Sequence, residues 1–276
     1  MFNLLKALSN IIVLIHVILL LACSTPSLPP VQLANALPAP SVVSKDSIPL
    51  EVQKIMTCYP AVIGFSDNHL LFHDGSKILF DDGKKKSNIE LLENPDIQDM
   101  FTYEYRHWKD SSIPQHYDPG RIRVDSFFMK IYGTNKSEVQ GNLVKVKWCP
   151  TLINQDIMVT NVNGVHLKID SLSKELDQMP QYKEYFQKIG GTFNWRVISG
   201  TSRLSAHSFG MTIDINPKYS NYWQWDCRCK NEYNRLTYTN KVPDEIVRVF
   251  EKYGFIWGGN WYHYDTMHFE YRPELL

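Results

Sequence analysis

Two stretches near the C-terminal end decide the fold of this chain: Ser205-Ala206-His207-Ser208-Phe209-Gly210-Met211-Thr212-Ile213-Asp214, and Trp257-Gly258-Gly259-Asn260-Trp261 followed by Asp265-Thr266-Met267-His268-Phe269-Glu270. In the first stretch, a turn at residues 208–210 lets His207 and Asp214 reach one point from a loop and the strand that follows it. Gly210 permits the close backbone approach that this turn requires. In the second stretch, Asp265 lies three residues before His268, so a tight turn can bring both to the same point.

These residues are the types that hold a catalytic metal. Two imidazoles and one carboxylate supply three ligands for zinc and leave a fourth position open for water. A further carboxylate, Asp265, can then accept a proton from that water and return it to a leaving amine. Each stretch has a simpler interpretation when taken alone: His207 as a hydrogen-bonded loop histidine, Asp214 as a turn residue, and the second stretch as an aromatic corner of the core. Their occurrence together favours the metal site.

Taken in order, the two stretches resemble the VanY-type D-alanyl-D-alanine carboxypeptidase family, which includes D-Ala-D-Ala dipeptidases and L-alanyl-D-glutamate endolysins. The resemblance covers roughly residues 191–276. It implies that His207, Asp214 and His268 bind zinc and that Asp265 is the catalytic base.

The same resemblance implies an arginine that contacts the substrate carbonyl or carboxylate. Arg196 fits by its place on a strand expected over residues 192–198. However, the family often has a long insertion between this arginine and the histidine motif, whereas only ten residues separate Arg196 from His207. Arg203 is therefore the alternative. Either guanidinium can stabilise an oxyanion or bind a carboxylate, or simply form a surface salt bridge. Ser205 corresponds to a family serine that orients the substrate.

Other side chains near these motifs have supporting or uncertain roles. Glu270 is expected to support a histidine ligand, as carboxylates behind metal-bound histidines do. His263 does not match the motif. Four tryptophans either line a peptide groove or pack in the core: Trp223, Trp225, Trp257 and Trp261.

The remaining patterns predict an α+β fold with a small, mostly antiparallel sheet flanked by helices and a zinc site in its C-terminal part. Asp74-Gly75 between apolar alternations predicts a hairpin. Further strands are expected over residues 143–148, 192–198, 255–257 and 268–271. Helices are expected over residues 88–99, from Asp170 as N-cap to Met179, over 181–189, and from Pro243 to Gly254.

The N-terminal region predicts export. Lys6 precedes an apolar run at residues 11–21, and Leu20-Leu21-Ala22-Cys23 resembles a lipobox, so we expect a signal peptide over residues 1–22 and a lipid on Cys23. An ordinary signal peptide and a retained anchor are the alternatives. Residues 23–47 predict a tether, 48–164 a mixed region packing on the catalytic domain, and 165–276 that domain. Ser24, in place of a retention aspartate, favours the periplasmic face of an outer membrane.

The charge balance excludes some classes of binding partner, and the cysteine count limits the possible disulfides. The chain has 29 basic and 29 acidic residues, which gives no field to attract nucleic acid. The expected partners are peptidoglycan peptides and, through Cys23, a membrane. Four other cysteines allow three disulfide connectivities, of which Cys58–Cys149 is preferred; Cys227 and Cys229 could instead form a metal clip.

These observations predict a zinc-dependent peptidase that hydrolyses peptidoglycan stem peptides, foremost a D-alanyl-D-alanine carboxypeptidase. An L-alanyl-D-glutamate or crosslink endopeptidase is the alternative within the class. The alternative from another functional class is a noncatalytic zinc-containing lipoprotein that binds the wall. The presence of Asp265 argues against it, since an enzyme that has lost its activity usually loses its catalytic base. A closed end of the substrate groove would favour the carboxypeptidase, and an open groove the endopeptidase.

Overall fold

A computed structural model describes residues 48–108, 112–229 and 231–276, which form one compact unit. The predicted signal peptide, Cys23 and the tether lie outside the described residues. Within the described part, no helix is long and apolar enough to cross a membrane.

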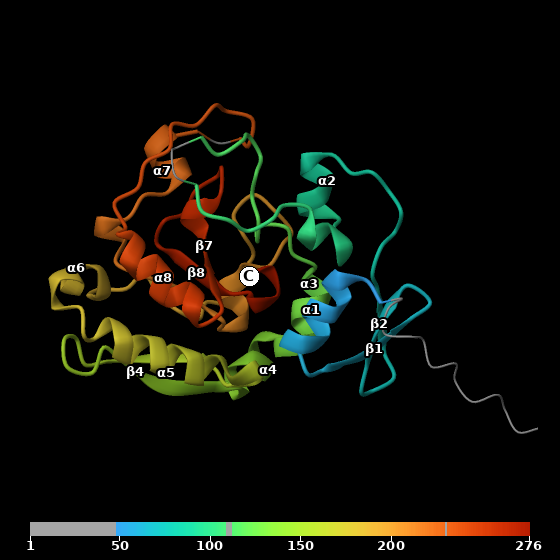
Figure 1. Ribbon diagram of the computed structural model, residues 1–276, viewed down its shortest axis with the longest axis horizontal. Helices are drawn as coiled ribbons and strands as arrows, with labels where there is room; N and C mark the ends of the chain where they lie inside the picture. Colours follow the sequence, from blue (N-terminus) through green and yellow to red (C-terminus); the bar gives the residue numbers. More distant parts are fainter. Residues whose placement is uncertain (1–47, 109–111, 230) are drawn as a thin grey trace, which may run out of the picture. The chain divides into compact units, whose positions relative to one another are not determined.

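The fold is α+β, as predicted, with three small antiparallel sheets and short helices (Figure 1). The helices are α1 (Leu50–Cys58), α2 (Asn88–Glu93), α3 (Asp125–Tyr132), α4 (Lys136–Gly141), α5 (Val165–Leu176), α6 (Lys183–Phe186), α7 (Trp223–Cys227) and α8 (Asp244–Lys252). The strands are β1 (Val62–Ser66), β2 (His69–Phe72), β3 (Lys77–Leu79), β4 (Leu143–Trp148), β5 (Gln155–Thr160), β6 (Thr212–Asp214), β7 (Phe255–Trp257) and β8 (His268–Tyr271).

The C-terminal sheet has the strand order β6-β8-β7, with β8 paired antiparallel to both neighbours. Helix α8 covers it, and the stacked rings of Phe250 and Phe269 have centroids 3.7 Å apart. The predicted strands β7 and β8 and the predicted helix after Pro243 are confirmed. The apolar stripe of α8 therefore fixes the sheet that carries His268.

A hairpin of β4 and β5, with α5 packed along it, forms the next layer. The predicted strand β4 is confirmed, but the predicted first residue of α5 was wrong. The helix begins at Val165 after Gly164, which has a φ of 69°. Asp170 lies inside the helix and pairs with Lys174 one turn on, so its acidic side chain is an i,i+4 partner rather than a cap. The following helix is also shorter than predicted, because α6 ends at Phe186.

The N-terminal region supplies α1, the sheet β1-β2-β3, and α2. The predicted hairpin around Asp74-Gly75 is confirmed by the pairing of β2 with β3. The helix expected over residues 88–99 ends early, at Glu93, and a separate 3-10 turn covers Gln98–Phe101. One contiguous hydrophobic core runs from α1 to β8.

The strand predicted over residues 192–198 is wrong, because its backbone groups bond to residues 205–208, around His207, instead of to a strand. Ser205 N donates to Arg196 O at 3.0 Å, and Arg196 N donates to Ser208 Oγ at 3.0 Å. Only an isolated bridge between Val197 and Leu204 remains of sheet pairing there.

The preferred disulfide is also wrong. Cys58 and Cys149 are unpaired, and the structure pairs Cys227 with Cys229. Cys58 ends α1, whereas Cys149 is buried after β4, where its N–H donates to Ser173 Oγ at 2.7 Å.

Candidate metal centre

The three predicted ligands meet at one end of the C-terminal sheet. Asp214 ends β6 directly opposite His268, the first residue of β8. His207 comes from the 3-10 turn Ala206–Phe209, which ends at Gly210 with a φ of 65°. A Cβ at Gly210 would lie 2.6 Å from Leu143 Cδ2 and 3.3 Å from Thr160 N, so glycine, with its positive φ, suits the close packing of this turn against the β4–β5 layer.

Asp214 lies between the two imidazoles. Its Oδ2 is 3.1 Å from His207 Nε2, and its Oδ1 is 3.0 Å from His268 Nδ1. The far nitrogen of His207, Nδ1, donates to Thr192 O at 3.0 Å, which leaves Nε2 free to ligate. These atoms form a group that could hold a metal ion.

Glu270 lies behind His268, on the side away from Asp214. Its Oε2 is 3.1 Å from His268 Nε2, and its Oε1 accepts from Arg272 at 3.2 Å. Burial alone would raise the pKa of Glu270, but Arg123, His268 and Arg272 lower it to about 2. Burial would lower the pKa of His268, but the two carboxylates raise it to about 10. The position between Asp214 and Glu270 therefore favours positive charge, which a metal ion can supply in place of a proton.

Two other groups of potential ligands occur in the described residues, and each already has a protein cation. Arg121 bonds both Asp118, at 2.9 Å, and Glu232, at 2.8 and 2.7 Å, in the group that includes His263. The third group is Asp81, Asp82 and Asp96, and Lys86 pairs with two of its members. The group of His207, Asp214 and His268 is the one whose ion pairs contain no lysine or arginine.

Asp265 lies beside the ligands, as its spacing predicted. A tight turn is closed by His268 N, which donates to Asp265 O at 3.2 Å. Gly258 packs so closely that a Cβ there would lie 2.5 Å from the same carbonyl. Burial, and then the charge of Asp214, raise the pKa of Asp265 to about 7. Its Oδ1 is buried and has no hydrogen-bond partner among the described residues.

A cavity of about 230 Å³ opens over the three ligands and Asp265, and both candidate arginines line it. Arg196 is exposed, and its guanidinium reaches only Val197 O, at 3.5 Å. Arg203 is buried and donates to Arg121 O at 3.3 Å. Burial, and then the charges of Arg123 and Arg121, lower the pKa of Arg203 to about 10. Ser205 also lines the cavity and is buried.

Two of the four tryptophans considered in the sequence line the cavity, and the other two lie elsewhere. Trp223 and Trp261 line the cavity. Trp257 packs in the core, where its Nε1 donates to Thr266 O at 2.9 Å. Trp225 is exposed and is absent from the cavity lining.

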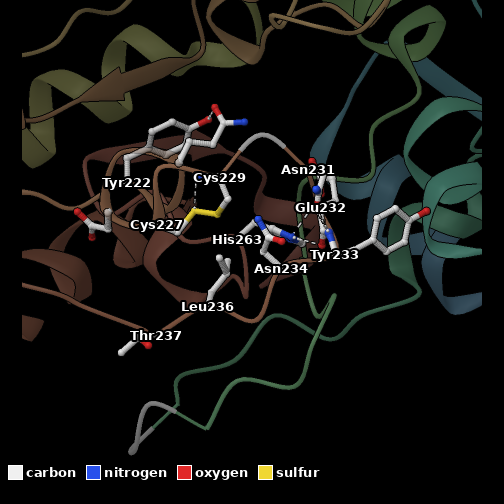
Figure 2. The surroundings of a disulfide bond; sticks show 12 residues. Tyr222, Cys227, Cys229, Asn231, Glu232, Tyr233, Asn234, Leu236, Thr237 and His263 are labelled. Atoms are coloured by element: carbon white, nitrogen blue, oxygen red, sulfur yellow. Dashed lines mark hydrogen bonds and ion pairs between the residues drawn. A yellow bond between two sulfur atoms is a disulfide. The ribbon is translucent and has the colours of Figure 1, made fainter.

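Several cavity residues were missed by sequence reasoning because they belong to no motif. Arg121 and Arg123 come from the segment before α3, and Glu232 comes from the loop after α7. Figure 2 shows this loop, with Glu232 near His263 and the Cys227–Cys229 disulfide. His263 Nδ1 bonds Asp118 Oδ2 at 2.6 Å, so this histidine belongs to the wall of the cavity and not to the metal group. The only signal in the sequence was the cluster of basic residues at 121–123.

Comparison with known families gives one match over this region. Residues 199–271 match the family model described as D-alanyl-D-alanine carboxypeptidase. The resemblance seen in the sequence is thereby confirmed over these residues. The carboxypeptidase match contains the three ligands, Asp265 and Arg203, and it excludes Arg196 and the segment of Arg121 and Arg123. It supports a metal-dependent peptidase that acts on peptidoglycan-type substrates. Comparisons with curated proteins and with solved structures gave no significant match.

Proposed function

We propose that the protein is a zinc-dependent peptidase that removes the terminal residue from D-alanyl-D-alanine ends of peptidoglycan stem peptides. The observation that carries this proposal is the juxtaposition of His207, Asp214 and His268 with the unpartnered carboxylate oxygen of Asp265 in one cavity. Two imidazoles and one carboxylate, oriented from behind by Thr192 O and Glu270, fit the ligand set of catalytic zinc.

In this mechanism the three ligands hold the ion, which supplies Lewis acidity toward the scissile carbonyl. Asp265 accepts a proton from the attacking water and delivers it to the amine nitrogen as the peptide bond breaks. Arg203 and Arg196 line the same cavity, which supports a role for their guanidinium groups in binding substrate oxygens.

An ion pair joins two segments of the cavity wall. Arg121 binds Glu232 through two hydrogen bonds, of 2.8 and 2.7 Å, and thus joins the segment before α3 to the loop after α7. Both residues line the cavity. The choice of carboxypeptidase over endopeptidase rests on the description of the family model that matches residues 199–271.

The proposal is tested with full-length protein and defined muropeptides that end in D-Ala-D-Ala. We expect loss of one alanine with zinc, none with chelator, and a decrease of about 10²-fold to 10⁴-fold in kcat for Asp265→Asn. Asp170→Asn, in an exposed ion pair, is the matched control. Products are identified by mass spectrometry. Cleavage of an internal peptide bond would show that the protein is an endopeptidase. Tight zinc binding without cleavage would favour a noncatalytic protein that binds the wall.

The location of the protein is a separate proposal. We infer a lipid anchor on Cys23, at the bacterial envelope and on the periplasmic face of an outer membrane, from the lipobox-like sequence alone. Fatty-acid labelling of the wild type but not of Cys23→Ala would support the anchor, and equal labelling of both would contradict it.

A further inference from the structure

The disulfide between Cys227 and Cys229 lies at the C-terminal end of α7 and is accessible from solvent (Figure 2). Cys227 and the intervening Arg228 are exposed, and Cys229 is half-buried. Thiol–disulfide exchange requires that a thiolate reach one of the two sulfur atoms, and exposed disulfides are the ones that exchange readily. The position of this disulfide therefore permits exchange with thiols from outside the molecule.

The segments on either side of the disulfide are held by other contacts. In α7, Trp223 N donates to Tyr264 O at 2.9 Å, and Asp226 Oδ2 accepts from Tyr264 OH at 2.9 Å. Beyond the disulfide, Arg121 donates to both carboxylate oxygens of Glu232. A disulfide across a single residue also restricts the unfolded chain little. The fold can therefore survive cleavage of this bond, as a disulfide that exchanges reversibly requires.

The residue between the two cysteines favours cleavage of the disulfide. Arg228 has a φ of 54°, in the left-handed region that a side chain of this kind rarely adopts. Because the disulfide spans this residue, its cleavage removes a restraint on a strained backbone. A guanidinium next to a cysteine also stabilises the thiolate that cleavage produces. Both effects favour the dithiol form.

The two sulfur atoms are not equivalent. The backbone N–H of Cys229 donates to Cys227 Sγ at 3.1 Å. A hydrogen bond to this sulfur stabilises negative charge on it, and Cys227 is also the more exposed of the two cysteines. Cys227 is therefore both the sulfur that an outside thiolate can reach and the better thiolate of the reduced pair.

We propose that Cys227 and Cys229 form a redox-active pair that exchanges its disulfide with thiols of an outside molecule. An outside thiolate attacks Cys227 Sγ, the S–S bond breaks, and Cys229 leaves as a thiolate. A second outside thiolate then attacks the outside sulfur of the mixed disulfide and releases Cys227. The two cysteines take up the two protons that the outside thiols lose. The pair gains two electrons, and the outside thiols are oxidised to a disulfide.

This activity is independent of the proposed peptidase, because no metal ligand takes part in it. Redox titration of the full-length protein tests it, with glutathione as a small thiol and reduced thioredoxin as a protein dithiol. Samples are quenched with acid and alkylated, and peptide mapping by mass spectrometry then reports the state of each cysteine.

We expect the pair to change from disulfide to dithiol within the range of glutathione buffers, and to reach the same equilibrium from either direction. Both reductants would support the proposal, and the faster one per thiol would identify the kind of partner. A disulfide that stays oxidised with both reductants is structural, and that result would overturn the proposal.

Two matched variants test the role of each sulfur. Cys229→Ser leaves Cys227 with the backbone N–H that donates to it, and Cys227→Ser leaves Cys229 alone. At pH 7, Cys227 should form a mixed disulfide with oxidised glutathione about 3-fold to 10-fold faster than Cys229 does, because its thiolate is the more stabilised and the more accessible. Equal rates, or a faster reaction of Cys229, would refute the role of Cys227. Thermal unfolding of both variants checks that the fold is intact.

Discussion

Oε2 of Glu270 lies 3.1 Å from Nε2 of His268, on the opposite side of the ring from the nitrogen that faces Asp214. A carboxylate in this position makes Nε2 the protonated nitrogen and leaves Nδ1 to ligate. Because Glu270 is fully buried and bonded to Arg272, the orientation of His268 is fixed before any metal arrives.

Replacing Glu270 with Gln should weaken zinc binding by about 10-fold to 100-fold, since an amide orients and polarises the imidazole less than a carboxylate does. The measurement is competition with a chromogenic chelator at fixed pH. Glu93→Gln, an exposed position at the end of α2, should leave the affinity unchanged. Unaltered zinc affinity in Glu270→Gln would remove the supporting role assigned to this residue.

The strand that carries His268 continues as a buried row of charges toward α1. Glu270, Arg272 and Glu274 follow at alternate positions and are all fully buried. Arg272 Nε donates to Glu274 Oε1 at 2.5 Å, and Tyr59 OH donates to Glu274 Oε2 at 2.6 Å. The row thus connects the metal centre to the N-terminal region through paired charges.

Glu274→Gln should destabilise the fold by about 3–5 kcal/mol, because it leaves Arg272 buried with only Glu270 to share its charge. Chemical denaturation measures this loss. The control is Glu175→Gln, which breaks an ion pair with Lys252 at the surface and should cost less than about 1 kcal/mol. Equal small losses in both variants would show that the buried pair contributes no more than an exposed one.

The sequence could predict those parts of the site that depend on neighbouring residues. One short motif places His207 near Asp214, and another places Asp265 near His268. The long-range pairing of β6 with β8 then joins the two motifs, and the family resemblance, not local sequence, predicted that step. By contrast, Arg123 and Trp261 line the same cavity although they lie far apart in the sequence, and no local pattern predicts this.

The predictions that were wrong depended on contacts between residues that are distant in the sequence. Residues 192–198 alternate like a strand, but their backbone bonds were taken by the loop of residues 205–208. Asp170 has the side chain of an N-cap, but it also suits an i,i+4 pair, and tertiary packing decided between them. Disulfide connectivity depends on the distance between layers, which the spacing of cysteines does not contain.

Asp118 should make stability depend on pH at the acidic end. Burial alone would raise its pKa, but Arg121 and His263 lower it to about 2. A carboxyl whose folded pKa lies below its unfolded value of about 3.9 stabilises the fold above that value. This contribution, about 2–3 kcal/mol, is lost as the pH falls from about 4 toward 2.

The difference in free energy of unfolding between wild type and Asp118→Asn should therefore be largest near pH 6. This difference should decrease by about 2–3 kcal/mol as the pH falls to about 2. Urea denaturation at several pH values provides the measurement. Asp170→Asn, in the exposed pair with Lys174, should differ from wild type by less than about 1 kcal/mol throughout. A constant difference for Asp118→Asn across this range would show that its pKa is not lowered in the fold.

The cysteines give a prediction that depends on connectivity alone. Unfolding without reductant should leave Cys58 and Cys149 open to alkylation, while Cys227 and Cys229 remain linked in one peptide. In the native protein, burial raises the pKa of Cys149 to about 12 and of Cys58 to about 11, so both should resist alkylation at pH 8. Peptide mapping by mass spectrometry identifies each residue.

Reduction of the native protein should lower the free energy of unfolding by roughly 1–2 kcal/mol, because a bridge across one intervening residue restricts the unfolded chain little. A Cys58–Cys149 bridge would close a long loop and contribute about 4–5 kcal/mol. A large effect of reductant, with a Cys58–Cys149 peptide in the map, would therefore restore the connectivity first expected from the sequence. It would also require α1 and the end of β4 to lie closer together than the structure places them.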